Sequence, residues 1–259
     1  MNTALYYFSG TGNSLSVAQS LNTLIKESEL YPIIGCLKQK PVQIKAQRVG
    51  IIFPIHFMTI PCVVKEFLTE VSFLHPKYVF VIVTGASPKL GNTLSQVEKY
   101  LNKINVNLNA AYFVPMIAAH FPYIRISKAK DTNEIYKAAK EKVIEISLNI
   151  INQKNEIDKE FSVVGNIKQL ISKEAKGNQN HFSVGEGCIR CGYCMQVCPF
   201  QNIRLHGKQV QWLDNCHYCF ACLHFCSQSV IQYKNLSIGK PRQHHPSILL
   251  NDIALQRDI

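Results

Sequence analysis

The sequence lacks long apolar segments, a signal-peptide pattern and a balance of charge. Its longest apolar runs, such as Tyr78–Val83, fall far short of the roughly 20 residues of a membrane-spanning helix. Residues 1–7 contain neither the basic region nor the small-residue cleavage site of a signal peptide. We therefore expect no membrane insertion and a cytoplasmic location.

Acidic residues are few. The 17 Asp and Glu residues stand against 28 Lys and Arg residues, which gives a formal net charge of +11. Such an excess is typical of a solvated lysine-rich surface, and it also suits an acidic redox partner or nucleic acid. No segment resembles a recognition helix or a base-stacking platform, so nucleic-acid binding is not expected.

The remaining composition is globular. The 259 residues are 47% hydrophobic and 17% charged, and the length suits two domains. In the first 117 residues, short apolar runs alternate with helical stretches, which predicts an α/β architecture with a doubly wound parallel five-stranded sheet. Strands are expected at Ala4–Phe8, Tyr31–Ile34, Val49–Phe53, Tyr78–Val83 and Tyr112–Met116. Helices are expected at Ser14–Lys26, Cys62–Thr69, Thr93–Lys103, Thr132–Ile151 and, shorter, Val163–Lys173.

Ten cysteines are present, and only Cys36 and Cys62 lie outside residues 188–226. A disulfide framework is not expected in a cytoplasmic protein. The other eight cysteines form two runs of the pattern C-x-x-C-x-x-C-x-x-x-C, the second starting 28 positions after the first, and the repeat extends to Ile203 and Ile231. We infer an internal duplication of a ligand loop, a helical turn and a short strand.

This spacing is typical of two-cluster ferredoxins, in which the fourth cysteine of each run binds the other [4Fe–4S] cluster. One predicted ligand set is Cys188, Cys191, Cys194 and Cys226. The other is Cys216, Cys219, Cys222 and Cys198. Structural zinc, the alternative, needs only two cysteine pairs. Pro199 completes the ferredoxin pattern after Cys198, whereas Ser227 follows Cys226 where proline is usual.

The cysteine-rich segment predicts a small α+β domain of residues 179–259, following a first domain of residues 1–178. Residues 177–180 are polar and glycine-containing, as expected of a domain boundary. Because two clusters would join its halves, this domain is expected to fold only with metal. Its predicted apolar shell consists of Ile189, Tyr193, Val197, Tyr218, Phe220, Leu223, Phe225 and Ile231.

A glycine-containing loop follows the first predicted strand. It reads Ser9-Gly10-Thr11-Gly12-Asn13-Ser14 and leads directly into a helix. Backbone N–H groups, hydroxyls and the helix dipole would converge there on a phosphate. The loop is neither G-x-G-x-x-G nor a Walker loop, since it has no lysine, and a simple turn with a helix cap is the alternative.

The loop resembles the FMN phosphate loop of flavodoxins. With the cysteine runs behind it, nearly the whole chain resembles flavodoxin–ferredoxin fusion proteins, often named EFR1-family ferredoxins. The resemblance implies a flavodoxin-like domain that binds FMN without covalent attachment. It also implies two loops around the flavin ring, 54–61 and 84–92. In them Pro54 and Ile55 would contact the ring, His56 or Phe57 would stack on it, and Gly85 and Gly91 would approach its pyrimidine edge.

Together these features predict an electron-transfer flavoprotein of anaerobic-type metabolism. Electrons would pass between two [4Fe–4S] clusters and FMN, with a ferredoxin, a flavodoxin or a reductase as the redox partner protein. No dedicated catalytic acid–base pair is apparent. The alternative is a ferredoxin-dependent flavin reductase that reduces a small molecule at the FMN face, with His56 and His120 as candidate proton donors.

Overall fold

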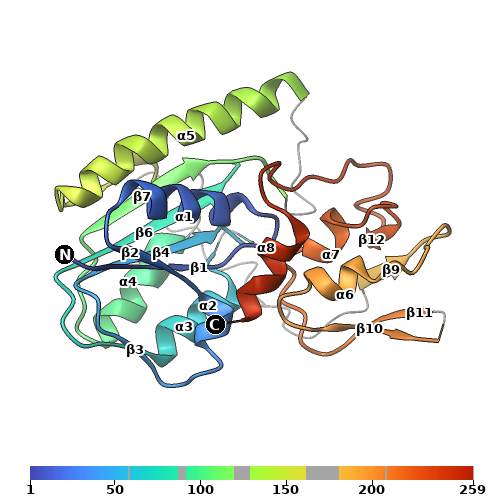
Figure 1. The fold of residues 1–259 in the computed structure, drawn as a ribbon, viewed down its shortest axis with the longest axis horizontal. Coiled ribbons are helices and arrows are strands. Elements are labelled where there is room, and N and C mark those ends of the chain that lie inside the picture. The colour runs from blue at the N-terminus through green and yellow to red at the C-terminus, as the bar shows by residue number, and fades with distance from the viewer. Residues whose placement is uncertain (58, 87–91, 120–128, 162–180, 208, 259) are drawn as a thin grey trace.

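The fold was analysed in a computed structural model that describes residues 1–57, 59–86, 92–119, 129–161, 181–207 and 209–258. The chain forms a larger α/β part and a smaller cysteine-rich part, and its C-terminal segment returns to the first part (Figure 1). Of the sequence predictions, Gly91, His120, the domain boundary at 177–180 and the helix at Val163–Lys173 lie outside the described residues.

The first part is built on a parallel sheet. Its strands are β1 (Thr3–Tyr7), β2 (Ser28–Pro32), β4 (Arg48–Pro54), β6 (Tyr78–Gly85), β7 (Ala110–Pro115) and the two-residue β8 (Glu156–Ile157). They lie in the order β2-β1-β4-β6-β7-β8 with every pairing parallel. The five longer strands thus have the flavodoxin-like order 2-1-3-4-5. The predicted five-stranded sheet is confirmed, and β8 extends it by one strand that was not predicted. The strand expected at Tyr31–Ile34 was misplaced, because β2 ends at Pro32 and the next two residues begin the helix α2 (Ile33–Cys36).

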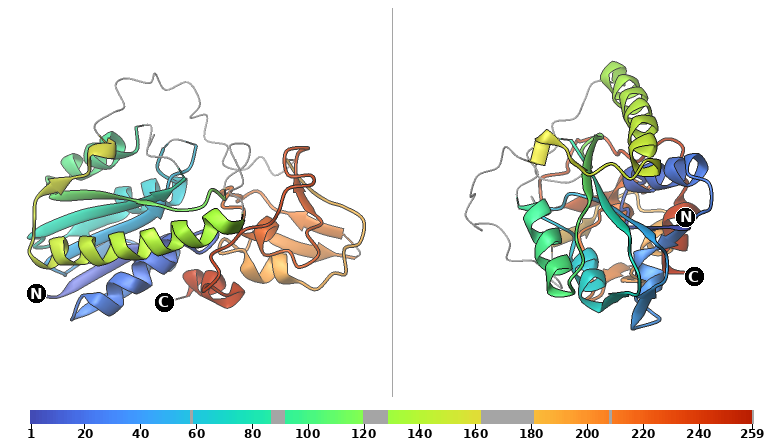
Figure 2. Two further views of the ribbon diagram at one scale, coloured as in Figure 1. Left: turned by 90° about the horizontal axis from the view of Figure 1, so that it is seen from above. Right: turned by 90° about the vertical axis from the view of Figure 1, so that its left-hand side faces the viewer.

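Helices cover both faces of the sheet (Figure 2). The core between the sheet and α1 (Asn13–Leu24) and α5 (Ala129–Ile151) contains Leu5 and Tyr7. Ala4 and Tyr6 point to the opposite face, where they pack with α2 (Ile33–Cys36), α3 (Cys62–Glu70) and α4 (Thr93–Lys103). Alternate residues of β1 are therefore buried on opposite faces, which explains its continuous apolar run. A short parallel pair, β3 (Val42–Ile44) and β5 (Val71–Phe73), lies apart from the main sheet.

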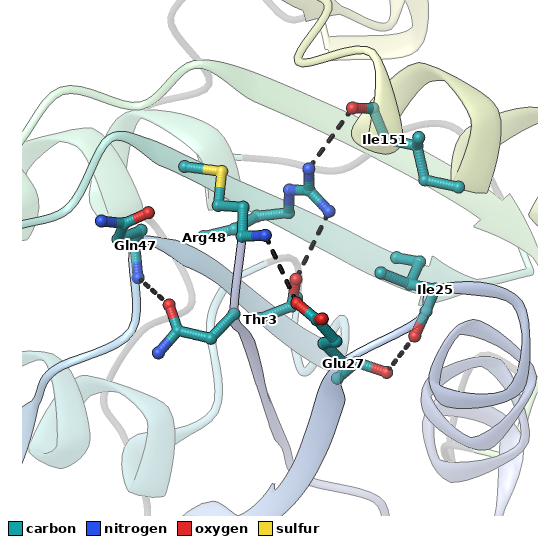
Figure 3. Close-up of polar contacts among 9 residues, drawn as sticks. Thr3, Ile25, Glu27, Gln47, Arg48 and Ile151 are labelled. Carbon is teal, nitrogen blue, oxygen red and sulfur yellow. Dashed lines mark hydrogen bonds and ion pairs between the residues drawn. The ribbon is translucent and has the colours of Figure 1, made fainter.

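Polar contacts tie the elements together where the first strands begin (Figure 3). The buried Arg48 donates from Nη2 to the carbonyl of Ile151 at 3.3 Å, and from Nη1 to Thr3 Oγ1 at 3.4 Å. Ile151 is the last residue of α5, so the guanidinium lies at the negative end of the helix dipole. This end of the sheet is therefore held by internal contacts, and the opposite, carboxyl end carries the candidate site.

The second part contains two short antiparallel pairs. In one, β9 (Phe182–Val184) pairs with β12 (Ile231–Tyr233), and in the other β10 (Ile203–His206) pairs with β11 (Gln209–Trp212). The short helices α6 (Tyr193–Val197) and α7 (Ala221–His224) carry cysteines, as predicted for a small α+β domain. The chain ends in α8 (Leu250–Ala254) and a 3₁₀ turn (Leu255–Arg257), and a further 3₁₀ turn spans Lys159–Phe161. None of the described helices combines the length and apolar character needed to span a membrane.

Candidate cofactor sites

The loop after β1 places a row of backbone N–H groups at the start of α1. Gly12 has a left-handed backbone, with φ of 95°, and its N–H donates to Ser9 Oγ at 3.0 Å. In the part of the chain that the structure describes, no acceptor pairs with the N–H groups of Thr11, Asn13 and Ser14. Orphan donors at a helix N-terminus are suited to bind an anion.

The side chains of the same loop face neighbouring strands. Ser14 Oγ lies 2.8 Å from Thr84 Oγ1, and Asn13 Nδ2 donates to the carbonyl of Ile117 at 2.9 Å. Asn13 Oδ1 is buried and has no hydrogen-bond partner among the described residues. A buried acceptor of this kind costs stability unless a donor reaches it. The loop therefore offers several donors for a phosphate and one acceptor for a hydroxyl, as a phosphate ester of a polyol requires.

A cavity of about 310 Å³ opens beside this loop at the carboxyl ends of the parallel strands, where open α/β sheets bind ligands. Of the predicted flavin residues, the cavity is lined by Ser9, Gly10, Thr11, Asn13, Ser14, Pro54, Ile55, His56, Phe57 and Gly85. Gly12 caps the helix instead of lining the cavity. The remaining lining residues are Thr84, Ala86, Ile117, Ala118, Ala119 and Cys219.

Cys219 brings the cysteine-rich part into this cavity. A Cβ atom added to Gly10 would lie 2.2 Å from the carbonyl oxygen of Cys219. The two backbones are therefore in direct contact, and only glycine fits at position 10 without displacing one of them. Neither the cysteine spacing nor the glycine-containing loop predicts this contact.

His56 and Phe57 lie at the cavity wall nearest the cysteine-rich part. The His56 backbone forms reciprocal hydrogen bonds with Thr59, and its ring stands edge-on to Phe8 with centroids 5.8 Å apart. Burial, with a smaller effect of His217, lowers the pKa of His56 to about 4, so its ring is neutral at pH 7. Phe57 has a left-handed backbone, with φ of 46°, and its ring stands edge-on to Tyr218 at 6.3 Å.

Acid should destabilise the fold through His56. Its pKa of about 4 in the folded protein lies below the usual value of 6.5, so the unfolded chain binds the proton first. The free energy of unfolding should therefore fall as the pH drops from 6.5 to 4, by about 2 kcal/mol at pH 5 relative to pH 7.5. His56→Asn should reduce this loss, measured by urea denaturation of the full chain at both pH values. The exposed His75→Asn is the matched control, and an unchanged pH dependence in His56→Asn contradicts the prediction.

The eight cysteines of the two runs surround two cavities. The outer set consists of Cys188, Cys191, Cys194 and Cys226. The inner set consists of Cys198, Cys216, Cys219 and Cys222. Each set combines three cysteines of one run with the fourth of the other, which is the grouping expected if the two runs exchange their last ligand. The assignment of these residues as cluster ligands stays a prediction.

The duplication extends to the backbone. Left-handed residues recur 28 positions apart, in the pairs Arg190 and Tyr218, Gly192 and Phe220, and Gln201 and Ser229. The strands β10 and β12 start at the equivalent residues Ile203 and Ile231. Phe220 is notable, because a bulky residue rarely adopts positive φ and does so only where its surroundings enforce it. Both halves therefore fold their cysteine loops in the same way despite different side chains.

The two sets differ in exposure. Cys198, Cys216 and Cys222 of the inner set are buried, whereas Cys191 of the outer set is exposed. Burial raises the pKa of the Cys194 and Cys216 thiols to about 11, so thiolates at these positions would need a bound metal to stabilise them. Within the described ranges, no three His, Cys, Asp or Glu side chains are grouped as ligands of a single metal ion.

Hydrogen bonds and aromatic rings support the inner set. The N–H of Asn202 donates to Cys198 Sγ at 3.3 Å, a contact of the kind that tunes cluster potentials. Trp212 stacks on Phe182 with ring centroids 5.5 Å apart. Six residues of the predicted shell are buried, namely Val197, Tyr218, Phe220, Leu223, Phe225 and Ile231. Ile189 and Tyr193 line the cavity of the outer set but are 61% and 44% exposed, so the prediction that they exclude water was wrong.

Comparison with known proteins bears on both parts of the chain. Residues 182–227 match the family described as a 4Fe-4S dicluster domain. This match supports iron–sulfur clusters and an electron-transfer role. No curated protein matches the chain.

Among solved structures, a flavodoxin of Streptococcus pneumoniae TIGR4 is 9% identical and covers 59% of this chain and 99% of its own, with a TM-score of 0.38. A cysteine-to-alanine mutant of a Pseudomonas aeruginosa flavodoxin is 14% identical and covers 58% and 99%, with a TM-score of 0.36. Rubredoxin oxygen:oxidoreductase from Desulfovibrio gigas is 12% identical and covers 58% and 37%, with a TM-score of 0.31. The fold assignment rests on the strand order above.

Proposed function

We propose that the protein is a cytoplasmic electron-transfer flavoprotein of anaerobic-type metabolism, close to the flavodoxin–ferredoxin fusions that its sequence resembles. Two [4Fe–4S] clusters are held by the outer and inner cysteine sets, and FMN occupies the cavity beside the phosphate loop. The support comes from the orphan N–H groups of that loop, the buried acceptor of Asn13 and the match to the dicluster family.

One observation carries the proposal: Cys219 belongs to the inner set and also lines the flavin cavity. Its carbonyl oxygen lies against Gly10 of the phosphate loop. Electrons would therefore pass between the flavin and the inner cluster, and between the inner and outer clusters. The exposed Cys191 makes the outer cluster the point of exchange with a redox partner protein. Bound FMN supplies one- and two-electron chemistry, whereas each cluster carries one electron.

The residues around the cavity favour a carrier over a reductase. Among the described lining residues, only His56 and Cys219 carry titratable side chains. His56 is a poor proton donor at neutral pH, because burial lowers its pKa to about 4. Reduced protein should therefore reduce quinones, enones and nitro compounds only slowly and without selectivity. Fast turnover of one of these classes would instead establish the ferredoxin-dependent flavin reductase.

Anaerobic reconstitution tests the proposal. Full-length protein supplied with iron, sulfide and FMN should bind about eight irons and one flavin per chain. A redox titration followed by EPR and visible spectroscopy should show reducible clusters that exchange electrons with the flavin. Protein that binds zinc in place of iron, or clusters that cannot be reduced, would refute the proposal.

A further inference from the structure

We infer that the cysteine-rich part and the C-terminal segment hold the phosphate loop and the wall of the flavin cavity in place. Cluster assembly should therefore raise the affinity for FMN, and bound FMN should stabilise the clusters. The inference rests on the proposed function and adds a regulatory coupling between its two cofactor sites. Four contacts carry it: Cys219 on Gly10, described above, and three further contacts made by Gln256, by His245 with Ile248, and by His224.

Gln256 fixes the first residue of the phosphate loop. Its side chain is fully buried, its Oε1 accepts from the Ser9 N–H at 2.8 Å, and its Nε2 donates to the Ser9 carbonyl at 2.8 Å. Both backbone groups of Ser9 are thus held by one side chain that lies 247 positions away in the sequence. Nε2 also donates to the carbonyl of Ile253 at 3.1 Å, which fixes the amide in this orientation.

The segment before α8 packs on the middle of the phosphate loop. The N–H of His245 donates to the Thr11 carbonyl at 2.8 Å. A Cβ atom added to Gly12 would lie 2.8 Å from Cβ of Ile248 and 3.0 Å from Cβ of His245. This close packing, together with the φ of 95° at Gly12, leaves no room for another residue at the cap of α1. The loop that carries the orphan N–H groups is therefore held in place beside the cavity.

His224 contacts a further residue of the cavity wall, Ala119. This buried residue of α7 has Nε2 at 2.7 Å from the Ala119 carbonyl, while its Nδ1 accepts from the Gln243 N–H at 3.1 Å. Ala119 lines the flavin cavity, and His224 lies in the loop that carries Cys222 and Cys226. One imidazole thus links the cysteine loop, the C-terminal segment and the flavin cavity.

The coupling follows from what the cysteine-rich part needs in order to fold. Without clusters, this part keeps two empty cavities lined by eight cysteines, and small metal domains of this kind lose their structure without metal. The contacts on Ser9, Thr11, Gly12 and Ala119 would then be lost, and the phosphate loop would be less well ordered. Because linkage is reciprocal, bound FMN must stabilise the assembled clusters by the same factor.

The decisive experiment compares full-length wild-type protein with and without clusters. The Kd of FMN is measured anaerobically from flavin fluorescence, first with all clusters loaded and then after chelation of the iron. We expect the Kd to rise at least about tenfold without clusters, within the usual range of such couplings. Saturating FMN should also slow the release of iron to a chelator. An equal Kd in both states, with FMN bound in each, would overturn the coupling and leave the proposed function intact.

Gln256→Met tests the contact directly. Methionine matches the length of glutamine but cannot hydrogen-bond to Ser9, so we expect the Kd of FMN to rise about tenfold at unchanged iron content. Gln19→Leu, at an exposed position of α1, is the control for loss of a glutamine amide. An unchanged Kd in Gln256→Met would show that the hydrogen bonds of Gln256 to Ser9 do not contribute to FMN binding. If cluster-loaded wild-type protein bound no FMN at all, the proposed function and the coupling would both fall.

Discussion

Replacing Gly10 with alanine is expected to slow electron transfer between the inner cluster and the flavin several-fold, because the rate of electron tunnelling falls exponentially with the distance between the carriers. The new Cβ would lie 2.2 Å from the Cys219 carbonyl oxygen and 3.1 Å from Cys219 Cβ. Both neighbours belong to the cysteine loop, so the clash can be relieved only by moving that loop away from the cavity or by distorting the phosphate loop. Either movement separates the two proposed electron carriers.

Stopped-flow reduction of cluster-loaded, FMN-loaded protein measures this effect through the flavin absorbance. Gly185→Ala is the matched control, because a Cβ there would meet its nearest neighbour, the Val230 carbonyl oxygen, at an ordinary 3.5 Å. The control should load iron and reduce flavin as wild type does. Gly10→Ala protein that binds FMN and reduces it at the wild-type rate would show that the two backbones are not in contact.

Local patterns predicted most of the long strands and helices of the α/β part, but not the short elements α2, β3 and β5. The expected helix at Thr93–Lys103 coincides with α4, and the strand expected at Tyr78–Val83 is extended by two residues to Gly85. Uninterrupted apolar runs indicate strands that are buried on both faces, and β1 is such a strand. The two-residue β8 has no apolar run of its own, and its backbone pairing to β7 alone defines it.

The contacts between the two parts could not be predicted in this way. Gly10 and Gly12 appear in the sequence as loop glycines of a phosphate site, yet both also make room for residues from the C-terminal third of the chain. Gln256 gives no signal in the sequence, since a single glutamine belongs to no motif and its position alone does not predict burial. Such contacts depend on how the two parts dock, and sequence spacing does not determine docking.

The way in which the two parts dock also determines which proposed cluster lies nearer the flavin. The duplicated cysteine pattern does not determine this. The two runs are nearly equivalent in sequence and in backbone, so either could face the flavin. In the structure, the run that starts at Cys216 lies against the cavity, and the run that starts at Cys188 is closer to solvent. The proposed path therefore leads from an exposed outer cluster through a buried inner one to the flavin.

Substitution of the two final cysteines should separate the clusters functionally. If the runs exchange their last ligand, Cys198→Ala damages the inner cluster although Cys198 follows Cys194 in the first run. Cys226→Ala damages the outer cluster in the same way. Each variant should lose iron from about eight per chain toward about four, and each should lose the magnetic interaction between two reduced clusters in EPR spectra.

The two variants should differ in how the flavin is reduced. Cys226→Ala keeps the inner cluster beside the cavity, so its flavin should still exchange electrons with the remaining cluster. In Cys198→Ala the remaining cluster lies in the outer set, none of whose cysteines lines the flavin cavity. We expect flavin reduction through it to be much slower, because the rate of electron tunnelling falls exponentially with distance. Cys62→Ala, outside both runs, is the control and should retain wild-type iron content.

If each run supplied all four ligands of its own cluster, the two results would be exchanged: Cys226→Ala would isolate the flavin and Cys198→Ala would spare it. The pair of variants therefore tests the exchange of ligands and the order of the carriers in one experiment.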